Sequence, residues 1–336
     1  MRIENVEVVF HRTVRVPDGR QPSNLPPSLG RMDLYPVAKY AKRCPENWDK
    51  DAYFLALHET EAMWMSFRSP AHPVAMLVGA GGINALTGEK LGITLEKDNY
   101  LVAPPQPWLD GWKDKDGTVY QFVATAYKKG EGITVAEQLM GEESKTGAIG
   151  IAFFNPKDPE KLKRKHTPVQ GHTLSANGND FMEKMGAFTA MFSSESAKLS
   201  SQAPAASAKE SLFRFFGGER TTFDEMGIGR GGKIMQKIYP DPHGLDVWEQ
   251  SPWSTLACYL VNAEVFEEIT GEHIPRPVSS EKYSGLWFGL KDQAEGDIAG
   301  TNKFTGLKSA VFPAAPVQPG DEPASEPVAT KLGETK

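Results

Sequence analysis

The feature that most limits the possible fold is a dense run of strand patterns in residues 100–154. It contains the segments YLVAPPQPWLDGW, TVYQFVATAY and GAIGIAFF. In the second segment, Tyr120, Phe122 and Ala124 alternate with other residues, which is the period-two pattern of a strand with one buried face. The third segment is apolar on both faces, as in a central strand covered on both sides. The chain is therefore expected to be mainly β.

Strand patterns recur through much of the remaining chain. We expect strands in residues 3–16, on both sides of a turn at residues 58–61, and in residues 74–78, 233–244, 253–261 and 283–290. The 32 glycines and 25 prolines indicate many turns. Helices are expected to be short: one in residues 36–43, one capped by Thr134 and Glu137 and closed by Gly141, and one between Asn262 and Gly271.

These patterns predict a β-rich α+β fold of two packed antiparallel sheets, similar to a β-sandwich, with a few short helices. The alternative is two smaller α+β domains that divide near residue 156. Residues 156–232 contain a Ser/Ala-rich stretch and glycine runs, so we interpret them as a flexible insertion into a single domain that spans residues 1–312. Residues 313–336 lack apolar periodicity and are expected to be a disordered tail.

Composition and charge narrow the classes of partner. The net charge is −6, whereas a nucleic-acid-binding protein needs clustered Lys and Arg. No apolar run approaches the roughly 18 residues needed to span a bilayer, and the N-terminus has no apolar leader region. The two cysteines, Cys44 and Cys258, are expected to be buried thiols, although one disulfide bridge is possible. We expect a soluble, cytoplasmic protein with no nucleic-acid or membrane partner.

Two clusters could support metal chemistry. His58, Glu59 and Glu61 could bind a metal or share acid–base catalysis, but the H-E-x-x-H pattern is absent and a polar turn explains them equally well. Asp241 and Asp246 could bind Ca²⁺, but they lack EF-hand spacing, and the Pro-Asp-Pro-His-Gly sequence that contains Asp241 is a good turn without any ligand.

Nucleotide and serine-hydrolase signatures are weak or missing. Residues 79–82 and 227–232 are rich in glycine, but neither run lies between a strand and a long helix, as dinucleotide binding requires. There is no P-loop and no G-x-S-x-G elbow. No cofactor is expected.

The Pro-rich segment with Trp108 and Trp112 is the most distinctive motif. Three prolines fix the backbone of residues 104–107, and two indoles follow within five residues. Such indoles can pack on the sheet, anchor a subunit contact or stack against a ligand such as a sugar. We expect one indole to point inward and Trp112 to point outward.

The phrases ETEAMWMSF, INALTG, APPQPWLDG, QFVA, TVAEQLMGEE and KIMQKIYPDPHGLDVW resemble an uncharacterised family of hypothetical proteins from filamentous fungi and bacteria. The resemblance covers roughly residues 5–155 and 232–272. It carries over no catalytic residue, because no activity is established for that family. It implies that the two blocks belong to one structural unit.

The sequence alone favours a non-enzymatic, self-associating structural or scaffold protein, most simply a homo-oligomer. Recognisable catalytic motifs are absent, and many strands leave edges that must be paired or covered. Two alternatives remain open. One is a metal-assisted hydrolase that uses His58, Glu59 and Glu61, and the other is a carbohydrate-binding module that uses Trp108 and Trp112.

Overall fold

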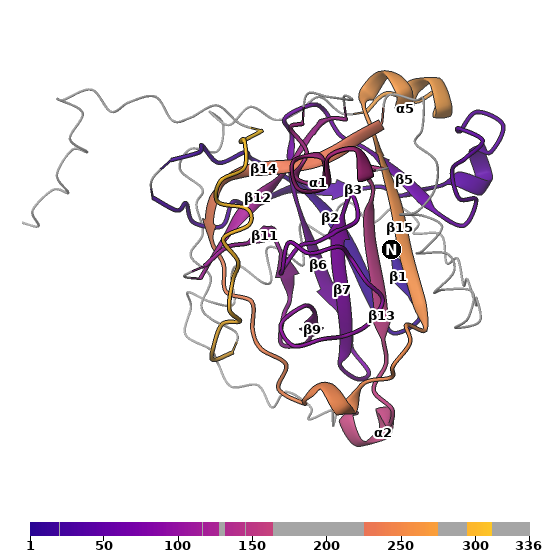
Figure 1. Ribbon diagram of the computed structural model, residues 1–336. Coiled ribbons are helices and arrows are strands. Elements are labelled where there is room, and N and C mark those ends of the chain that lie inside the picture. The colour runs from indigo at the N-terminus through magenta and orange to yellow at the C-terminus, as the bar shows by residue number, and fades with distance from the viewer. Residues whose placement is uncertain are drawn as a thin grey trace, which may run out of the picture.

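The structure, a computed structural model, describes residues 1–19, 21–115, 117–127, 132–144, 146–163, 225–274 and 294–310. The described chain is mainly β, with short helices at the margins of the sheet (Figure 1). The predicted fold class is therefore confirmed. All of the strands belong to one hydrogen-bonded network, and every pairing is antiparallel except that of β5 with β15.

The strands are β1 (Arg2–Ile3), β2 (Val6–Thr13), β3 (Ser28–Met32), β4 (Tyr35–Pro36), β5 (Tyr53–Ala56), β6 (Ala62–Arg68), β7 (Val74–Ala80), β8 (Ile83–Asn84), β9 (Leu101–Ala103), β10 (Trp108–Leu109), β11 (Gly111–Lys113), β12 (Thr118–Ala126), β13 (Ile149–Phe154), β14 (Glu225–Met235) and β15 (Ser254–Val261). The α-helices are α1 (Val135–Met140), α2 (Pro159–Leu162) and α5 (Ala263–Thr270), and the 3₁₀ helices are η1 (Val37–Tyr40), η2 (Gly141–Glu143) and η3 (Leu245–Val247).

The network consists of two halves that share one core. The first half runs β3-β2-β6-β12-β14, and the second runs β5-β15-β13-β7, with β8 and β9 on the far edge of β7. Among the described strands, the two halves pair where Glu225 and Met226 of β14 meet Val261 and Leu260 of β15. Inward side chains from both halves form the main hydrophobic cluster, so the halves pack face to face as a sandwich whose sheets are joined at one corner.

Alternation along the strands explains this core. In β6, Met63, Met65 and Phe67 point into the main cluster. In β12, Phe122 and Ala124 do the same, and Ile151 of β13 faces them from the second half of the network. The intervening residues point outward. The period-two pattern in the sequence therefore predicts correctly which residues are buried in the core.

The Pro-rich segment links the two halves on the side opposite this corner. β9 pairs with the beginning of β7, whereas β10 pairs with β6, so residues 104–107 cross from one half to the other. The Ala103–Pro104 and Pro104–Pro105 peptide bonds are both cis. The side chain of Gln106 holds the crossing in place: its Nε2 donates to the Trp108 carbonyl, and its Oε1 accepts from the Tyr239 N–H.

The glycine-rich strand β14 shows that the end of the predicted flexible insertion is a β-strand. Residues 225–232 of β14 lie within the segment that we interpreted as flexible, but β14 pairs with nearly the whole length of β12. The glycines allow other segments to approach the backbone closely. A Cβ on Gly232 would lie 2.1 Å from the Pro17 carbonyl oxygen, and a Cβ on Gly229 would lie 2.7 Å from the Ala310 Cβ. The glycines therefore serve close packing rather than flexibility.

Helices and loops cover the outer face of the second half. The hydrophobic side of α5 packs with Phe54 and Tyr259, and the Trp48 ring stacks on Tyr259 with a centroid distance of 4.2 Å. Asn262 caps α5 and Gly271 closes it in the left-handed conformation, as predicted. Thr134 and Glu137 form the predicted capping box of α1.

Other predictions fall partly or wholly outside the described residues. The expected strand at 283–290, the tail at 313–336 and the Ser/Ala-rich stretch between residues 164 and 224 belong to this group. No helix in the described ranges is both long enough and apolar enough to cross a bilayer.

Candidate functional site

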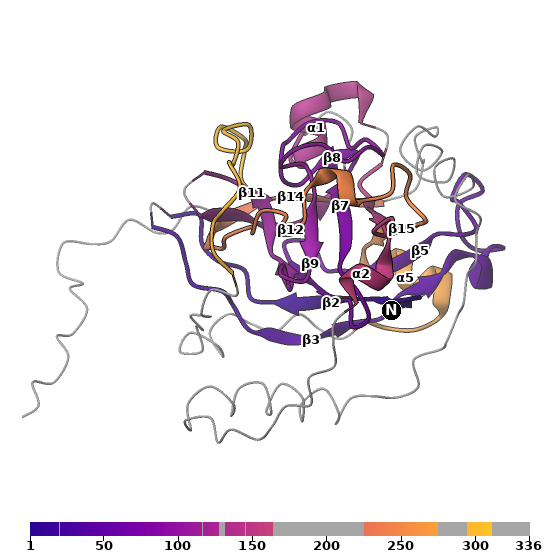
Figure 2. The same cartoon turned by 90° about the horizontal axis from the view of Figure 1, so that it is seen from below.

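Aromatic and polar side chains lie next to one another on the outer face of β2, β6 and β10. Pairing places His11 opposite Trp64 and Val9 opposite Ser66, and it places Trp108 opposite Ser66 on the other side of β6. Continuing the β6–β10 register by one residue places Asp110 opposite Trp64. We call this set the β2–β6–β10 face: Val9, His11, Trp64, Ser66, Trp108 and Asp110. Figure 2 shows β2 and β3 running together along one side of the molecule.

His11 is held on this face by three contacts. Its ring stacks on the Trp64 indole with a centroid distance of 3.8 Å and an interplanar angle of 9°. Its Nδ1 lies 3.0 Å from Ser28 Oγ, and its Nε2 lies 2.9 Å from Ser66 Oγ. Burial, aided by the nearby charge of Arg31, lowers the pKa of His11 to about 3. The imidazole is therefore neutral at physiological pH.

Asp110 is a buried carboxyl group that makes no hydrogen bond in the described structure. The residue is 1% exposed, and neither carboxyl oxygen has a partner. Burial raises the pKa of Asp110 well above its usual value. The Trp108 indole N–H points at the carboxyl group and partly offsets this rise, but it lies outside hydrogen-bond geometry. Burial therefore favours the protonated, neutral form of the Asp110 carboxyl group.

The two indoles of the face are also unsatisfied. The Nε1 atoms of Trp64 and Trp108 are buried, and neither has a hydrogen-bond partner within the described ranges. Buried polar atoms in native proteins are nearly always paired, and those that are not need an explanation. Four such atoms, two from Asp110 and one from each indole, lie in adjacent positions on this face. Trp108 and Ser66 are half-buried, so the face reaches the surface there.

A rigid frame holds β10 in place. The Asp110 N–H donates to Gln236 Oε1 at 2.9 Å, and Gln236 Nε2 donates to the Trp108 carbonyl at 3.1 Å. The Phe122 N–H donates to the Asp110 carbonyl. Together with Gln106, these bonds satisfy the backbone on both sides of Asp110. The unpaired side chains are therefore held by a well-bonded backbone, as in a preorganised binding site.

The structure places the predicted His58 cluster in a tight turn. The Glu61 side chain is buried and holds Arg12, with Oε1 2.8 Å from Nε and Oε2 3.1 Å from Nη2. Glu61 Oε2 also accepts from the His58 N–H, and Glu59 is exposed. Both carboxylate oxygens of Glu61 are thus used within the fold. Among the described residues, no group of three or more His, Cys, Asp or Glu side chains is arranged to hold a metal ion.

The side chains of Asp241 and Asp246 have different surroundings: that of Asp241 is hydrogen-bonded within the fold, and that of Asp246 is exposed. Asp241 Oδ2 accepts from Tyr100 Oη at 2.6 Å and from Trp248 Nε1 at 2.7 Å, and Oδ1 accepts from the His243 N–H. These bonds hold residues 240–248 against the second half. Asp246 is exposed, and its carbonyl accepts from Lys157 Nζ. Asp241 is therefore accounted for as a structural residue.

The predicted outward orientation of Trp112 is wrong. Trp112 is fully buried, its Nε1 donates to the Gly229 carbonyl at 3.2 Å, and its ring packs against Phe122 and Phe304. The chain rotates at Asp110 and Gly111, so Leu109 and Trp112 both point inward although their positions differ in parity. Trp108, rather than Trp112, is the indole that reaches the surface.

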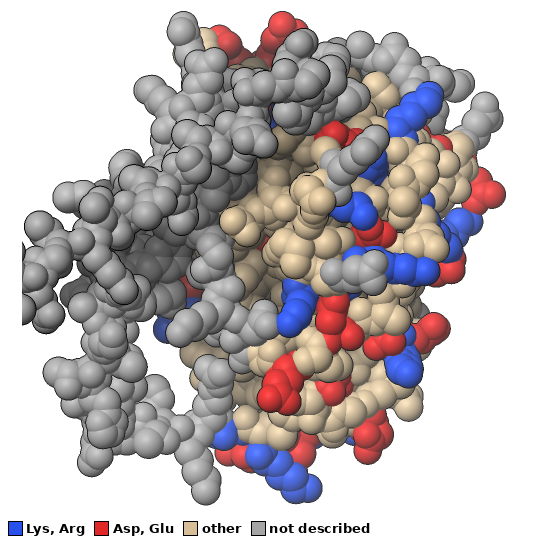
Figure 3. Space-filling view, turned by 90° about the vertical axis from the view of Figure 1, so that its left-hand side faces the viewer, with Lys and Arg blue, Asp and Glu red and all other residues tan. Residues whose placement is uncertain are grey.

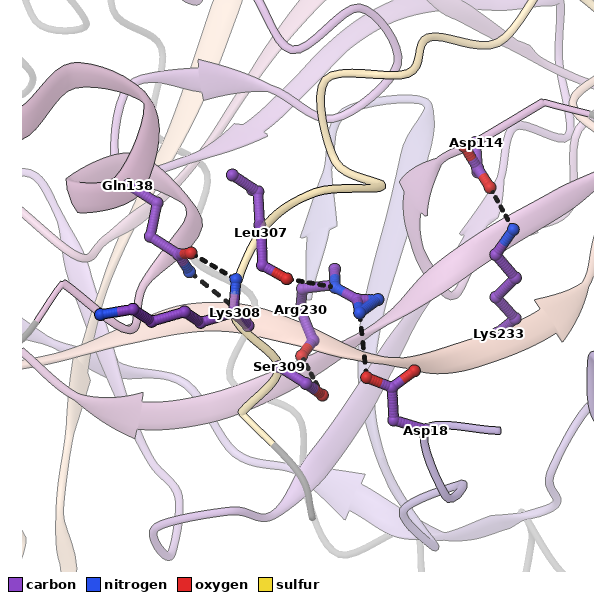
Figure 4. Close-up of polar contacts among 8 residues, drawn as sticks. All are labelled: Asp18, Asp114, Gln138, Arg230, Lys233, Leu307, Lys308 and Ser309. Atoms are coloured by element: carbon purple, nitrogen blue, oxygen red, sulfur yellow. Dashed lines mark hydrogen bonds and ion pairs between the residues drawn. The ribbon is translucent and has the colours of Figure 1, made fainter. Parts of the chain in front are cut away.

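A second polar cluster lies along β14 but is internally neutralised (Figure 4). Arg230 and Lys233 both lie over the Tyr120 ring. Each cation also pairs with a carboxylate: Arg230 with Asp18 at 2.9 Å, and Lys233 with Asp114 at 2.6 Å. The cluster has two positive and two negative charges, so it offers no net attraction to an anion.

The same cluster anchors residues 294–310. Arg230 Nε donates to the Leu307 carbonyl, and its own carbonyl accepts from Ser309 Oγ. The Lys308 N–H donates to Gln138 Oε1 (Figure 4). These contacts explain the polar residues here as structural. On the side shown in Figure 3, Lys and Arg are interspersed with Asp and Glu.

The cysteines match the sequence expectation of buried thiols. Cys44 and Cys258 are free and buried. Burial raises the pKa of Cys44 to about 11 and raises that of Cys258 further. Thiols with raised pKa values are poor nucleophiles at neutral pH.

Comparison with known proteins gives no match: no protein-family profile, no curated protein and no solved structure corresponds to this chain. The interpretation of its function therefore depends on its own residues.

Proposed function

We propose that this protein is a non-enzymatic binding protein and that the β2–β6–β10 face is its binding surface. One observation carries the proposal: four buried polar atoms of Trp64, Trp108 and Asp110 lack partners and lie together on one face. A bound molecule that paired with these atoms would remove the cost of leaving them unpaired, which is about 1–3 kcal/mol for each group.

The metal-hydrolase alternative has less support. It required free ligand atoms on His58, Glu59 and Glu61, but Glu61 is held by Arg12 and Glu59 points into solvent. On the β2–β6–β10 face, His11 is held between Ser28 and Ser66, but its low pKa makes it a weak base near pH 7. These observations favour binding over catalysis.

Self-association stays as a second candidate, with a different anchor. The edge strands are poorly suited to pair with another copy, because β3 contains a bulge at Leu29 and β4 ends in Pro36. Met235, at the end of β14, is 50% exposed and is the most exposed large hydrophobic side chain in the described residues. If this anchor operates, Met235→Lys should lower the native mass measured by light scattering. Leu245→Lys, at a similarly exposed residue, is the control.

The binding proposal is tested by thermal shift of the full chain against a panel of sugars, amino acids, nucleotides, short peptides and fatty acids. The comparison is between wild type and the double variant Trp108→Phe/Asp110→Leu, which removes three of the four unpaired polar atoms. We expect at least one class to stabilise wild type and to have a smaller effect on the variant. Trp253→Phe is the matched control, because Trp253 also has a buried, unpartnered Nε1 but packs against Phe153 in the other half. If no class distinguishes wild type from the double variant, the proposal fails.

A further inference from the structure

The chemistry of the β2–β6–β10 face restricts the class of molecule that it can bind. The two indoles can only donate hydrogen bonds through their N–H groups. A protonated Asp110 both donates and accepts, and so does the Ser66 hydroxyl. A complementary ligand must therefore present several acceptors together with donors, within the small area covered by two positions on each of three strands. Hydroxyl groups meet this requirement because each one donates and accepts.

The charges on the β2–β6–β10 face further narrow the class of ligand that it can bind. His11 is neutral, burial favours the neutral form of Asp110, and the other residues of the face carry no charge. Arg12, on the same strand, points the other way and is paired with Glu61. Arg31 lies beside His11 on β3 and is exposed to solvent. An ionic ligand would lose its hydration without gaining a buried counter-charge, so a neutral ligand is favoured.

The aromatic rings add the third requirement. Trp108 is half-buried beside Ser66, so this aromatic residue is partly accessible at the surface and could offer an apolar surface to a ligand. A purely apolar ligand would cover this ring but would leave the four unpaired polar atoms unsatisfied. The ligand needs an apolar face for stacking and hydroxyl groups at its rim. A sugar ring combines these properties.

We propose that the β2–β6–β10 face binds a neutral, polyhydroxylated small molecule, namely a sugar unit. Its ring stacks on Trp108, and its hydroxyl groups pair with the Trp64 and Trp108 N–H groups, Asp110 and Ser66. This inference rests on the proposed binding function and names the ligand class. It also replaces the predicted Trp108–Trp112 pair, because Trp112 belongs to the core.

Calorimetric titration of the full chain tests this inference. The probes are D-glucose, D-galactose, D-mannose and N-acetylglucosamine, together with glucosamine and glucuronate, which carry the same ring with a positive and a negative charge. We expect saturable binding of at least one neutral sugar and about tenfold weaker binding of its charged counterparts. Trp108→Phe keeps an aromatic ring and removes the N–H, and Asp110→Leu keeps a similar volume and removes both polar atoms of the side chain. Each should weaken binding several-fold, whereas Trp253→Phe should not change it.

The outcomes separate the ligand class from the binding function. If no neutral sugar binds, or if the charged sugars bind equally well, the sugar class is wrong. Should the thermal-shift panel then identify another class that needs Trp108 and Asp110, the binding function stands without sugars. If neither experiment detects binding at these residues, both proposals are overturned. Sugar binding that Trp108→Phe and Asp110→Leu leave unchanged would also overturn this site.

Discussion

His11 and Trp64 lie face to face across β2 and β6, with their ring centroids 3.8 Å apart and their planes within 9° of parallel. The imidazole is hydrogen-bonded at both nitrogens to serine hydroxyls, and burial keeps it neutral. The stack therefore joins strands β2 and β6 on the β2–β6–β10 face. It also makes the stability of the protein sensitive to pH.

We expect stability to fall between pH 7 and pH 5 because of His11. The pKa of His11 is about 3 in the folded chain and about 6.5 when the chain is unfolded. The unfolded state thus takes up a proton as the pH drops below 6.5, whereas the folded state takes one up only near pH 3. The stabilisation is complete above pH 6.5 and is lost progressively down to pH 3. At pH 5 the loss should be about 2 kcal/mol.

Urea unfolding at pH 7 and pH 5 measures this loss. His11→Gln cannot be protonated, so it should be less stable than wild type at pH 7 but lose about 2 kcal/mol less on acidification. His273→Gln, at an exposed histidine, is the control. An equal change for wild type and His11→Gln would contradict the assignment of a neutral, buried His11.

Asp110 should have the opposite pH dependence. Its pKa is raised in the folded state, so the unfolded chain releases this proton at a lower pH than the folded chain does. The contribution of Asp110 to stability is therefore present below the usual pKa of an aspartic acid and is lost as the pH rises toward the folded-state value. Asp110→Asn removes this loss, and its stability relative to wild type should increase between pH 4 and pH 8. A constant difference across this range, measured by urea unfolding, would show that Asp110 is ionised in the folded protein.

Breaking the Arg12–Glu61 pair should be strongly destabilising. The pair is buried, and Arg12 touches both carboxylate oxygens of Glu61. Glu61→Gln leaves a buried guanidinium without its counter-charge and should cost about 3–5 kcal/mol. The double variant Arg12→Met/Glu61→Leu should recover much of this loss, because no buried charge remains. Chemical unfolding measures both. A small effect of Glu61→Gln would restore the case for a functional role of this carboxylate.

Trp112→Ala should destabilise the monomer without changing its native mass. Trp112 is fully buried between Phe122 and Phe304, so its removal opens a large cavity and should cost about 3–5 kcal/mol. Thermal unfolding and light scattering on the same samples separate stability from assembly. A change in native mass with unchanged stability would revive the earlier hypothesis that Trp112 is an interface anchor.

Local patterns were enough to predict strands such as β6, β12 and β13 and the helix caps of α1 and α5. Alternation along β6 and β12 identifies the inward residues, and Thr134 and Asn262 begin helices as their side chains predict. These features depend on residues near one another in the chain. The expected turn at residues 58–61 also lies between β5 and β6, as predicted.

Features that depend on distant contacts were missed. Gly232 lies in a glycine-rich run that is typical of a flexible segment. A glycine is nevertheless required at this position because the Pro17 carbonyl lies against its backbone. The inward turn of Trp112 results from the rotation of the chain at Asp110 and Gly111, which alternation cannot reveal. The site itself combines residues from three strands: His11 falls on the polar parity of its strand, and nothing in its neighbourhood indicates that Trp64 and Ser66 hold it.

The most direct test of the account is an indole ¹⁵N–¹H spectrum of the full chain, titrated with the neutral sugar that binds most tightly. The seven tryptophans can be assigned with single Trp→Phe variants. We expect the Trp64 and Trp108 signals to shift in a saturable way, while those of Trp112 and Trp253 stay in place. Saturable binding that leaves Trp64 and Trp108 unmoved would contradict the assignment of the β2–β6–β10 face as the binding site.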